Sequence, residues 1–184
     1  MDYTINFYSH HSGYGEYFSN FSRHQVIMPA PEGFGYPELC IHEDIHKIRM
    51  CKVHMLKWKS SEHYYQACKL AYDPELYVKV YHCATPMASK MVGHKYPMIE
   101  NWECTPDENG RYLKDRVMFD VVLNKVIQND DILQTLLHTG TSKLAESSPK
   151  DYYWGVGADG TGKNMLGIIL MEVRDLCKRL FPNK

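Results

Sequence analysis

The sequence lacks the features that mark membrane, secreted and disulfide-bonded proteins. None of its apolar runs comes near the roughly eighteen residues that a membrane-spanning helix needs. The first residues carry neither the basic nor the apolar segment of a secretion signal. Its six cysteines form no CxxC pair, so neither a zinc ribbon nor a disulfide framework is predicted. We therefore expect an intracellular protein, in the cytoplasm or the nucleus, with no membrane contact.

The chain also lacks a strong excess of charge of either sign. It has 21 Lys and Arg against 22 Asp and Glu, whereas a protein that grips duplex nucleic acid mainly through its phosphates is strongly basic. We find no internal repeat, low-complexity tract or linker. Because 184 residues, 44% of them hydrophobic, are enough to bury one core, we expect a single domain over residues 1–184 with no obligate protein partner.

The apolar periodicity predicts a helix-rich α+β fold with a small antiparallel sheet. A strand is expected near Phe7, and partial alternation between 40 and 58 indicates a β-hairpin or pair of strands after a Pro/Gly-rich surface loop at 29–37. Helices are expected at about 61–72, from Thr85–Pro86 to a stop at Gly93, at 111–128, at 131–138 before Gly140, and from a cap at Asn164 to near Pro182.

The first of the longer helices carries a polar stripe. Glu62, Gln66 and Lys69 recur at helical spacing and so share one face. With about 1.5 Å of rise per residue, Glu62 and Lys69 stand roughly 10 Å apart along the axis, which suits two groups that flank a small polar substrate. The same pattern is also typical of a solvated helix face with its apolar residues turned to the core. The stripe alone therefore does not establish a site.

Two motifs match known patterns only in part. Residues 155–164 satisfy GxGxxG, but the chain ends after one more helix, and Asn164 stands where a phosphate loop needs Ser or Thr. This segment is either a plain turn or a set of backbone amides that hold a phosphate or carboxylate. His42 and His46 fit the zinc pattern HExxH, but they follow a Pro/Gly loop and lead into alternating sequence. We expect neither a metal nor a cofactor.

Trp102 and Asp151 are candidates because of their neighbours. Trp102 lies in an irregular polar segment, where its ring can fill the core or stack on a flat heterocycle. Asp151 precedes three aromatic residues and the glycine segment, so it is either a turn residue or a carboxylate of a site.

Taken together, these motifs resemble the NADAR family (NAD- and ADP-ribose-associated). The chain departs from the family at Gly93–His94, where Gly-Arg is frequent and a phosphate contact is expected, and in a longer segment from 23 to 58. The matching residues are Phe18–Phe21, Ser61–Ala67 with Lys69, Trp102, Leu136–Leu137 with Thr139–Gly140, Leu144 with Glu146, Asp151–Gly157, Asn164 with Leu166–Gly167, Leu170–Met171 and Arg174.

The resemblance implies a pocket with catalytic and substrate-binding residues. Members of the family include N-glycosidases of riboflavin-pathway intermediates and enzymes that remove ADP-ribose from guanine. The catalytic residues implied by the matches are Glu62, Lys69, Trp102 and Asp151. The expected substrate-binding residues are Ser19, Asn20, Phe21, Tyr65, Gln66, Trp154, Gly155, Gly157, Asn164 and Arg174.

Cleavage of a bond between ribose C1' and nitrogen needs an acid/base group and a group that stabilises the sugar centre. We assign Glu62 to the first role and Asp151 to the second, with Trp102 stacked on the base or ribose. The resemblance favours a further step, in which the Lys69 amine attacks C1' of the opened sugar and forms an imine that water clears. Phosphates would be held by the amides of 155–162 or by Arg174.

Our main hypothesis is an N-glycosidase that removes ADP-ribose from guanine, in nucleic acid or in a nucleotide. Three alternatives stay open at the level of sequence. The chain could cleave phosphorylated intermediates of riboflavin synthesis, bind ADP-ribose without catalysis, or act as a zinc hydrolase through His42 and His46.

Overall fold

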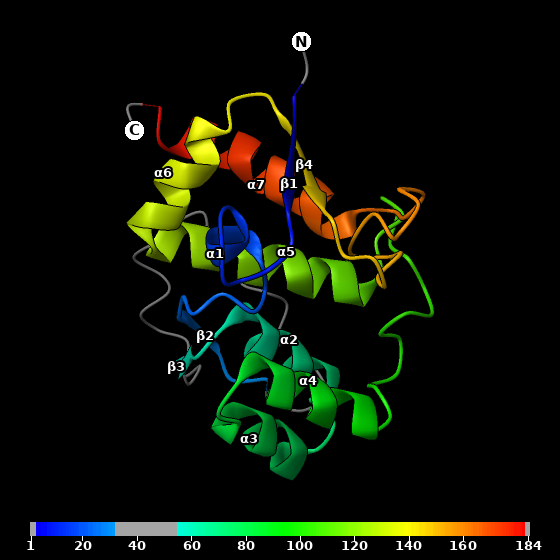
Figure 1. Ribbon diagram of the computed structural model, residues 1–184. Coiled ribbons are helices and arrows are strands. Elements are labelled where there is room, and N and C mark those ends of the chain that lie inside the picture. Colours follow the sequence, from blue (N-terminus) through cyan, green and yellow to red (C-terminus); the bar gives the residue numbers. More distant parts are fainter. Residues whose placement is uncertain (1–2, 32–54, 183–184) are drawn as a thin grey trace.

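The computed structural model describes residues 3–31 and 55–182, which form a helix-rich α+β fold of seven helices and four short strands. Helix α5 (Leu113–Gln128) runs through the middle of the molecule (Figure 1). Above it in that view lie β1 (Thr4–Phe7), β4 (Lys143–Glu146), α6 (Asp130–His138) and α7 (Met165–Leu180). Below it lie β2 (Val26–Pro29), β3 (Met55–Trp58), α2 (Ser61–Lys69), α3 (Pro74–His82) and α4 (Pro86–Lys95), while the one-turn helix α1 (Gly15–Phe18) packs near α6.

The strands form two separate pairs. β2 and β3 pair antiparallel, with Val26 opposite Trp58, so the small antiparallel sheet of the predicted fold class is confirmed. The partner of β3 is residues 26–29, where no strand was predicted, and most of the 40–58 segment expected to form a hairpin lies outside the described residues. β1 and β4 pair parallel, with Phe7 opposite Glu146. The sequence analysis did not foresee β4, because a strand of four residues is too short for a clear alternation. Pro29 is the last residue of β2 rather than the start of a loop, and residues 32–54 lie outside the described part of the chain.

The buried apolar side chains form one cluster to which α5 and α7 contribute most. On α7 the residues that recur at three and four positions, such as Leu166, Ile169 and Val173, are fully buried. The apolar face of this helix therefore anchors it in the core. In the described part of the chain, no helix is long and apolar enough to cross a membrane.

Two helix ends differ from the sequence-based expectation. α2 ends at Lys69 instead of about residue 72, because Leu70 leaves the helical conformation and its amide bonds back to Ala67 and Cys68. α4 continues through Gly93 to Lys95. Gly93 is needed inside this helix because a Cβ there would lie 1.8 Å from Oε1 of Gln66 on α2. The glycine therefore permits close helix packing rather than ending the helix.

Asn164 joins the start of α7 to β4. It adopts a left-handed conformation with φ of 55° and makes no side-chain cap bond, contrary to the prediction that it caps the helix. Its Oδ1 instead accepts a hydrogen bond from the Glu146 amide (2.9 Å), and its Nδ2 donates to the Leu144 carbonyl (2.8 Å). Asn tolerates this conformation better than most residues. The side chain therefore fixes β4 against the helix.

Replacement of Asn164 by Ala should destabilise the protein strongly. The change leaves the Glu146 amide and the Leu144 carbonyl without partners, so we expect unfolding free energy to fall by about 2–4 kcal/mol, measured by urea denaturation. Asn101→Ala is the matched control, because Asn101 also has a positive φ (65°), is exposed and has no side-chain bond to a described residue. Equal losses in the two variants would mean that backbone strain, and not the bridge to β4, explains the effect.

Candidate active site

The polar stripe of α2 is buried. Ser60 caps the helix, its Oγ accepting a hydrogen bond from the His63 amide. Glu62 is only 5% exposed and Gln66 only 3%, which contradicts the alternative of a solvated helix face. Gln66 Nε2 donates to Glu62 Oε1 at 2.9 Å. The stripe is therefore a polar pair inside the protein, held in place by its own helix.

Burial sets the proton affinity of Glu62. Removal from water raises the pKa of its carboxyl, while the Gln66 hydrogen bond and the charges of Lys90 and Lys69 lower it in part. The net direction is upward. A carboxyl of this kind holds its proton nearer to neutral pH than an exposed glutamate does, which suits a group that both gives and takes protons.

Lys69, one turn beyond Gln66, is only partly buried. Burial lowers the pKa of its amine, the charges of Glu103 and Glu62 oppose this, and Lys90 adds to it. Desolvation and a neighbouring cation are the two effects that release a neutral, nucleophilic amine from a lysine.

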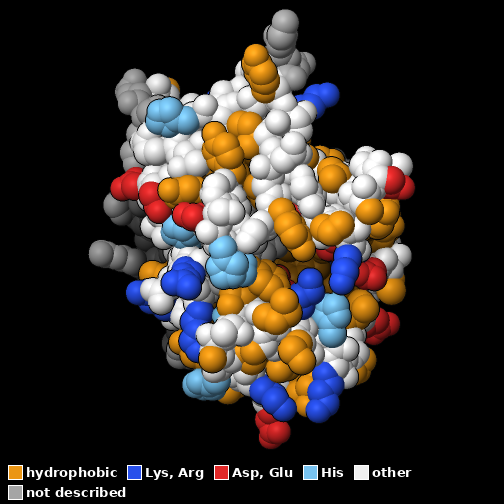
Figure 2. Space-filling model, in the orientation of Figure 1, with side chains coloured by type: hydrophobic (Ala, Val, Ile, Leu, Met, Phe, Trp, Pro, Cys, Tyr) orange, Lys and Arg blue, Asp and Glu red, His pale blue; other side chains and the backbone are white. Residues whose placement is uncertain are grey.

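Both residues face one cavity of about 290 Å³. On the face seen in Figure 2, the surface is hollowed above the region of α2 and α4, and Lys, Arg and His side chains lie along the lower side of the hollow. The cavity is lined by Ser19, Asn20, Phe21, Glu62, Tyr65, Gln66, Lys69, Lys90, His94, Trp102, Glu103, Met118, Glu146, Asp151 and Trp154. All four residues expected to be catalytic thus meet at one place, together with six of the ten expected to bind substrate.

Asp151 combines the two roles that the sequence left open. Its Oδ1 accepts hydrogen bonds from the amides of Tyr153 (3.0 Å) and Trp154 (2.7 Å), so it organises the turn after it. It also lines the cavity. The two amide donors fix the orientation of this carboxyl group at the edge of the pocket.

Aromatic rings form one wall of the cavity. Trp102 is 1% exposed and packs against Tyr65, with ring centroids 5.1 Å apart. Tyr65 in turn makes an edge contact with Trp154 at 5.6 Å. Trp102 is therefore both a core residue and part of the cavity wall.

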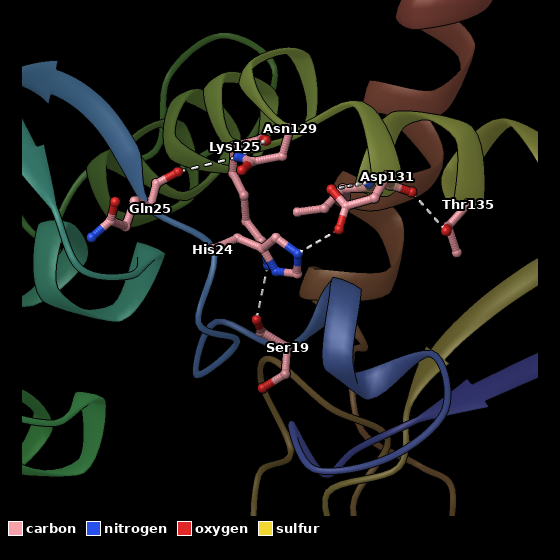
Figure 3. A network of polar contacts seen from close by, with 8 residues as sticks. Ser19, His24, Gln25, Lys125, Asn129, Asp131 and Thr135 are labelled. Carbon is pink, nitrogen blue, oxygen red and sulfur yellow. Dashed lines mark hydrogen bonds and ion pairs between the residues drawn. The ribbon is translucent and has the colours of Figure 1, made fainter.

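Residues 19–21 also line the cavity and are tied to the helices around them. The Asn20 carbonyl accepts a hydrogen bond from the Glu62 amide at 3.1 Å. Figure 3 shows Lys125 of α5 extending toward Ser19: its buried Nζ donates to the Ser19 carbonyl at 3.0 Å. Burial lowers the pKa of this lysine to about 7.

Further contacts in Figure 3 hold the chain that follows. Asn129 Nδ2 donates to the Gln25 carbonyl at 3.1 Å, and His24 Nε2 lies 2.9 Å from Asp131 Oδ2. These bonds join residues 19–25 to α5 and α6. The segment 19–25, which begins at the cavity, is therefore held by α5 and α6 as well as by α2.

Four expected substrate-binding residues lie outside the cavity lining. Arg174 is 4% exposed, and its guanidinium donates to Thr139 Oγ1 and to the Ser142 carbonyl, so it joins α7 to the end of α6. The Asn164 amide is used by β4, as described above. Gly155 packs against the Glu146 carbonyl, and Gly157 (φ 71°) lies under the Tyr152 ring. The two glycines and Asn164 shape the turn, and the guanidinium of Arg174 is used by the fold outside the cavity lining.

Five cavity residues were not predicted: Lys90, His94, Glu103, Met118 and Glu146. Lys90 and His94 are four positions apart on α4, a spacing that places both on one face. That pattern was available in the sequence, but only the packing of α4 on α2 turns it toward Lys69. Burial and the charges of Lys69 and Lys90 lower the pKa of His94.

The zinc alternative falls partly outside the described structure. His42 and His46 belong to residues 32–54. Among residues 3–31 and 55–182, no group of three or more His, Cys, Asp or Glu side chains is arranged to hold a metal ion.

The arrangement agrees with a comparison of the whole chain with known protein families. The model of the NADAR domain matches residues 6–178. The chain belongs to the NADAR family. The resemblance drawn from the sequence motifs is therefore confirmed.

Individual NADAR proteins extend this result. N-glycosidase YbiA of Escherichia coli is 32% identical over 95% of this chain and 89% of its own length. Its NMR structure matches with a TM-score of 0.72 at 29% identity, covering 100% of this chain and 89% of that one. N-glycosidase Npun_R5314 of Nostoc punctiforme is 34% identical over 67% of this chain and 76% of its own. The chain is accordingly an N-glycosidase of this family.

Another relative carries a name that refers to a pathway. Riboflavin biosynthesis protein VVA0006 of Vibrio vulnificus is 38% identical over 64% of this chain, which corresponds to 30% of that longer protein.

Substitution of Gly93 tests the packing that holds Gln66 against Glu62. Gly→Ala in a helix normally stabilises by roughly 0.5–1 kcal/mol, but here the new methyl group displaces Gln66 and should destabilise by about 1–3 kcal/mol. Base release should fall as well, because Glu62 loses its amide partner. The measurements are urea denaturation and turnover, with Met91→Ala on the exposed face of α4 as the control. A Gly93→Ala protein that is more stable and fully active would contradict this role.

Proposed function

We propose that this N-glycosidase cleaves the bond between ribose C1' and nitrogen in an ADP-ribosylated base, with guanine as the base. The observation that carries the proposal is the shared cavity of the buried Glu62 carboxyl and the partly desolvated Lys69 amine. An acid/base group and a nucleophile on the same helix face are what stepwise removal of a base from a sugar requires.

In the proposed reaction, Lys69 attacks C1' of the opened sugar and forms an imine, which water then hydrolyses. Glu62 transfers the protons, and the negative charge of Asp151 stabilises the positive charge that builds on the sugar. Asn20 Oδ1 is buried in the cavity lining without a hydrogen-bond partner among the described residues, so it is available to a sugar hydroxyl. The aromatic wall supplies a flat surface beside the base.

The diphosphate of the proposed substrate needs positively charged or hydrogen-bonding partners, for which the amides of 155–162 or Arg174 were expected from the sequence. Arg174 is occupied by Thr139 and Ser142, whereas Lys90 and His94 line the cavity and carry no ion pair with a described residue. We assign the phosphate contacts to Lys90, as the cation, and to His94, as a neutral hydrogen-bond donor because its pKa is lowered. The location inside the cell, cytoplasmic or nuclear, stays a prediction that follows from a nucleotide substrate.

A second candidate function is favoured by the relatives. The name of the Vibrio relative refers to riboflavin biosynthesis, so a phosphorylated ribosylamino-pyrimidine of that pathway is the competing substrate. The same residues would perform the same bond cleavage. A panel of ADP-ribosylated guanine, free and in an oligonucleotide, and of the pyrimidine intermediate, scored for released base, separates the two. A protein that binds ADP-ribose but releases no base from any of them would be a binding module instead.

Replacement of the two reacting groups should abolish turnover without loss of the fold. For Glu62→Gln we expect a decrease in kcat of about 10²–10⁴-fold, the usual contribution of acid–base catalysis. Lys69→Met should be at least as severe. Lys79→Met, on the exposed face of α3, serves as the control for loss of an amine. Full turnover by either folded active-site variant would remove that residue from the mechanism.

The imine itself can be trapped. Borohydride added during turnover should reduce it and leave an adduct of ADP-ribose on Lys69, detected by intact mass and peptide mapping. The yield should rise with pH through the pKa of the amine, because burial lowers that pKa and only the neutral amine attacks. An unmodified Lys69 under conditions of active turnover would favour direct attack by water.

A further inference from the structure

Glu146 is a carboxyl of the cavity that the mechanism above does not use. It is the last residue of β4 and its backbone is fixed on both sides. Its amide donates to Asn164 Oδ1 at 2.9 Å, and its carbonyl accepts from the Val156 amide at 2.9 Å. On β1, Phe7 is its partner in the parallel pair. The side chain therefore projects into the cavity from one of the most firmly held positions of the site.

The three buried or half-buried carboxyls of the cavity differ in their hydrogen bonds. Asp151 accepts two backbone N–H donors, and Glu62 accepts one amide donor from Gln66. The Glu146 carboxyl has no hydrogen-bond donor among the described residues. Donors stabilise a carboxylate and lower its affinity for a proton. Of the three, Glu146 is thus the carboxyl with the least support for a negative charge.

The surroundings of Glu146 also favour its protonated form. Burial first, and then the negative charges of Asp151 and Glu62, raise the pKa of its carboxyl to about 7 against the opposing charge of Lys90 on α4. The remaining titratable groups of the cavity are Tyr65, Lys69, His94 and Glu103. When carboxyl groups lie close together, their pKa values are driven apart, so that one stays protonated while another is ionised. The protonated group is the one that can serve as the acid.

We infer that Glu146 is a further catalytic residue, the acid that gives its proton to the nitrogen of the departing base. The inference rests on the proposed function, since it needs a C1'–nitrogen bond to be broken in this cavity. In this assignment Glu146 donates the proton to the base and Glu62 accepts the proton of the nucleophile, whereas Glu62 would otherwise perform both tasks.

In this step the C1'–nitrogen bond breaks, its electron pair goes to nitrogen, and the Glu146 proton forms the new N–H bond. A bond forms between C1' and the Lys69 nitrogen or a water oxygen, and the surplus proton of that nucleophile passes to Glu62. Exchange with solvent then removes the proton from Glu62 and returns one to Glu146.

The pH dependence follows from the direction of each shift. Glu146 must carry its proton, so this acid is lost as pH rises through about 7. Lys69 must be neutral, so the nucleophile is gained as pH rises. Wild-type turnover should therefore follow a bell-shaped profile whose basic limb belongs to Glu146.

Glu146→Gln provides the test, because the amide keeps the shape of the side chain but cannot transfer a proton. On an ADP-ribose linked to guanine we expect kcat to fall about 10²–10⁴-fold and the basic limb to disappear. When guanine in the same substrate is methylated at N7, its ring carries a positive charge, and the base can depart without receiving a proton. On that substrate the kcat of the variant should fall less than about tenfold. Glu100→Gln, an exposed glutamate, is the matched control.

A structural role would reduce turnover of both substrates equally and leave the basic limb in place, and either result would overturn the inference. If Glu146→Gln fails to fold, Glu146→Asp replaces it in the test, because Asp keeps the carboxyl group. The inference then requires that Glu146→Asp turns over more slowly and that the basic limb of its pH profile is retained at a shifted pH. Wild-type protein that releases no base from any substrate would overturn the proposed function and this inference together. If the wild-type protein is active and the Glu146→Gln variant keeps the basic limb of the pH profile, the inference is overturned but the proposed function stands.

Discussion

The hydrogen bond between Gln66 Nε2 and Glu62 Oε1, formed inside the protein at 2.9 Å, is the contact on which the site depends. An unpaired buried carboxyl is costly, and its cost is reduced here by a partner one turn along the same helix. Gly93 of α4 leaves room for that partner, since any side chain there would meet Gln66 Oε1. The Glu62 amide also holds the Asn20 carbonyl, so the first turn of α2 fixes both the acid and the opposite wall.

Distant parts of the chain meet around this helix because short bridges join them. Asn164 fixes β4, which carries Glu146, and Asp151 organises the turn that carries Trp154. Lys125 and Asn129 of α5 hold residues 19–25 by their carbonyls. None of these bridging side chains except Asp151 lines the cavity. The reacting groups thus rely on polar residues whose own contacts are with backbone, which is how a site becomes preorganised.

The sequence was sufficient for the long helices and for the membership of Glu62, Lys69, Trp102 and Asp151 in one pocket, because helical periodicity and ordered motifs are local signals. It was insufficient for β4, whose pairing with β1 depends on residues nearly 140 positions apart. Arg174 and Asn164 were expected to bind substrate but lie outside the cavity lining, since a polar residue in a family motif can serve the fold as well as the substrate. Lys90, His94 and Glu146 were missed because only the packing of α4 and β4 brings them to the cavity.

A crystal structure of the protein with ADP-ribose, the product of the proposed reaction, tests the central claim most directly. The claim predicts that ribose C1' lies between the Glu62 carboxyl and Lys69 Nζ, within about 3–3.5 Å of the amine, with the diphosphate toward Lys90 and His94. A nucleotide bound outside this cavity, or one whose C1' points away from α2 toward solvent, would contradict it.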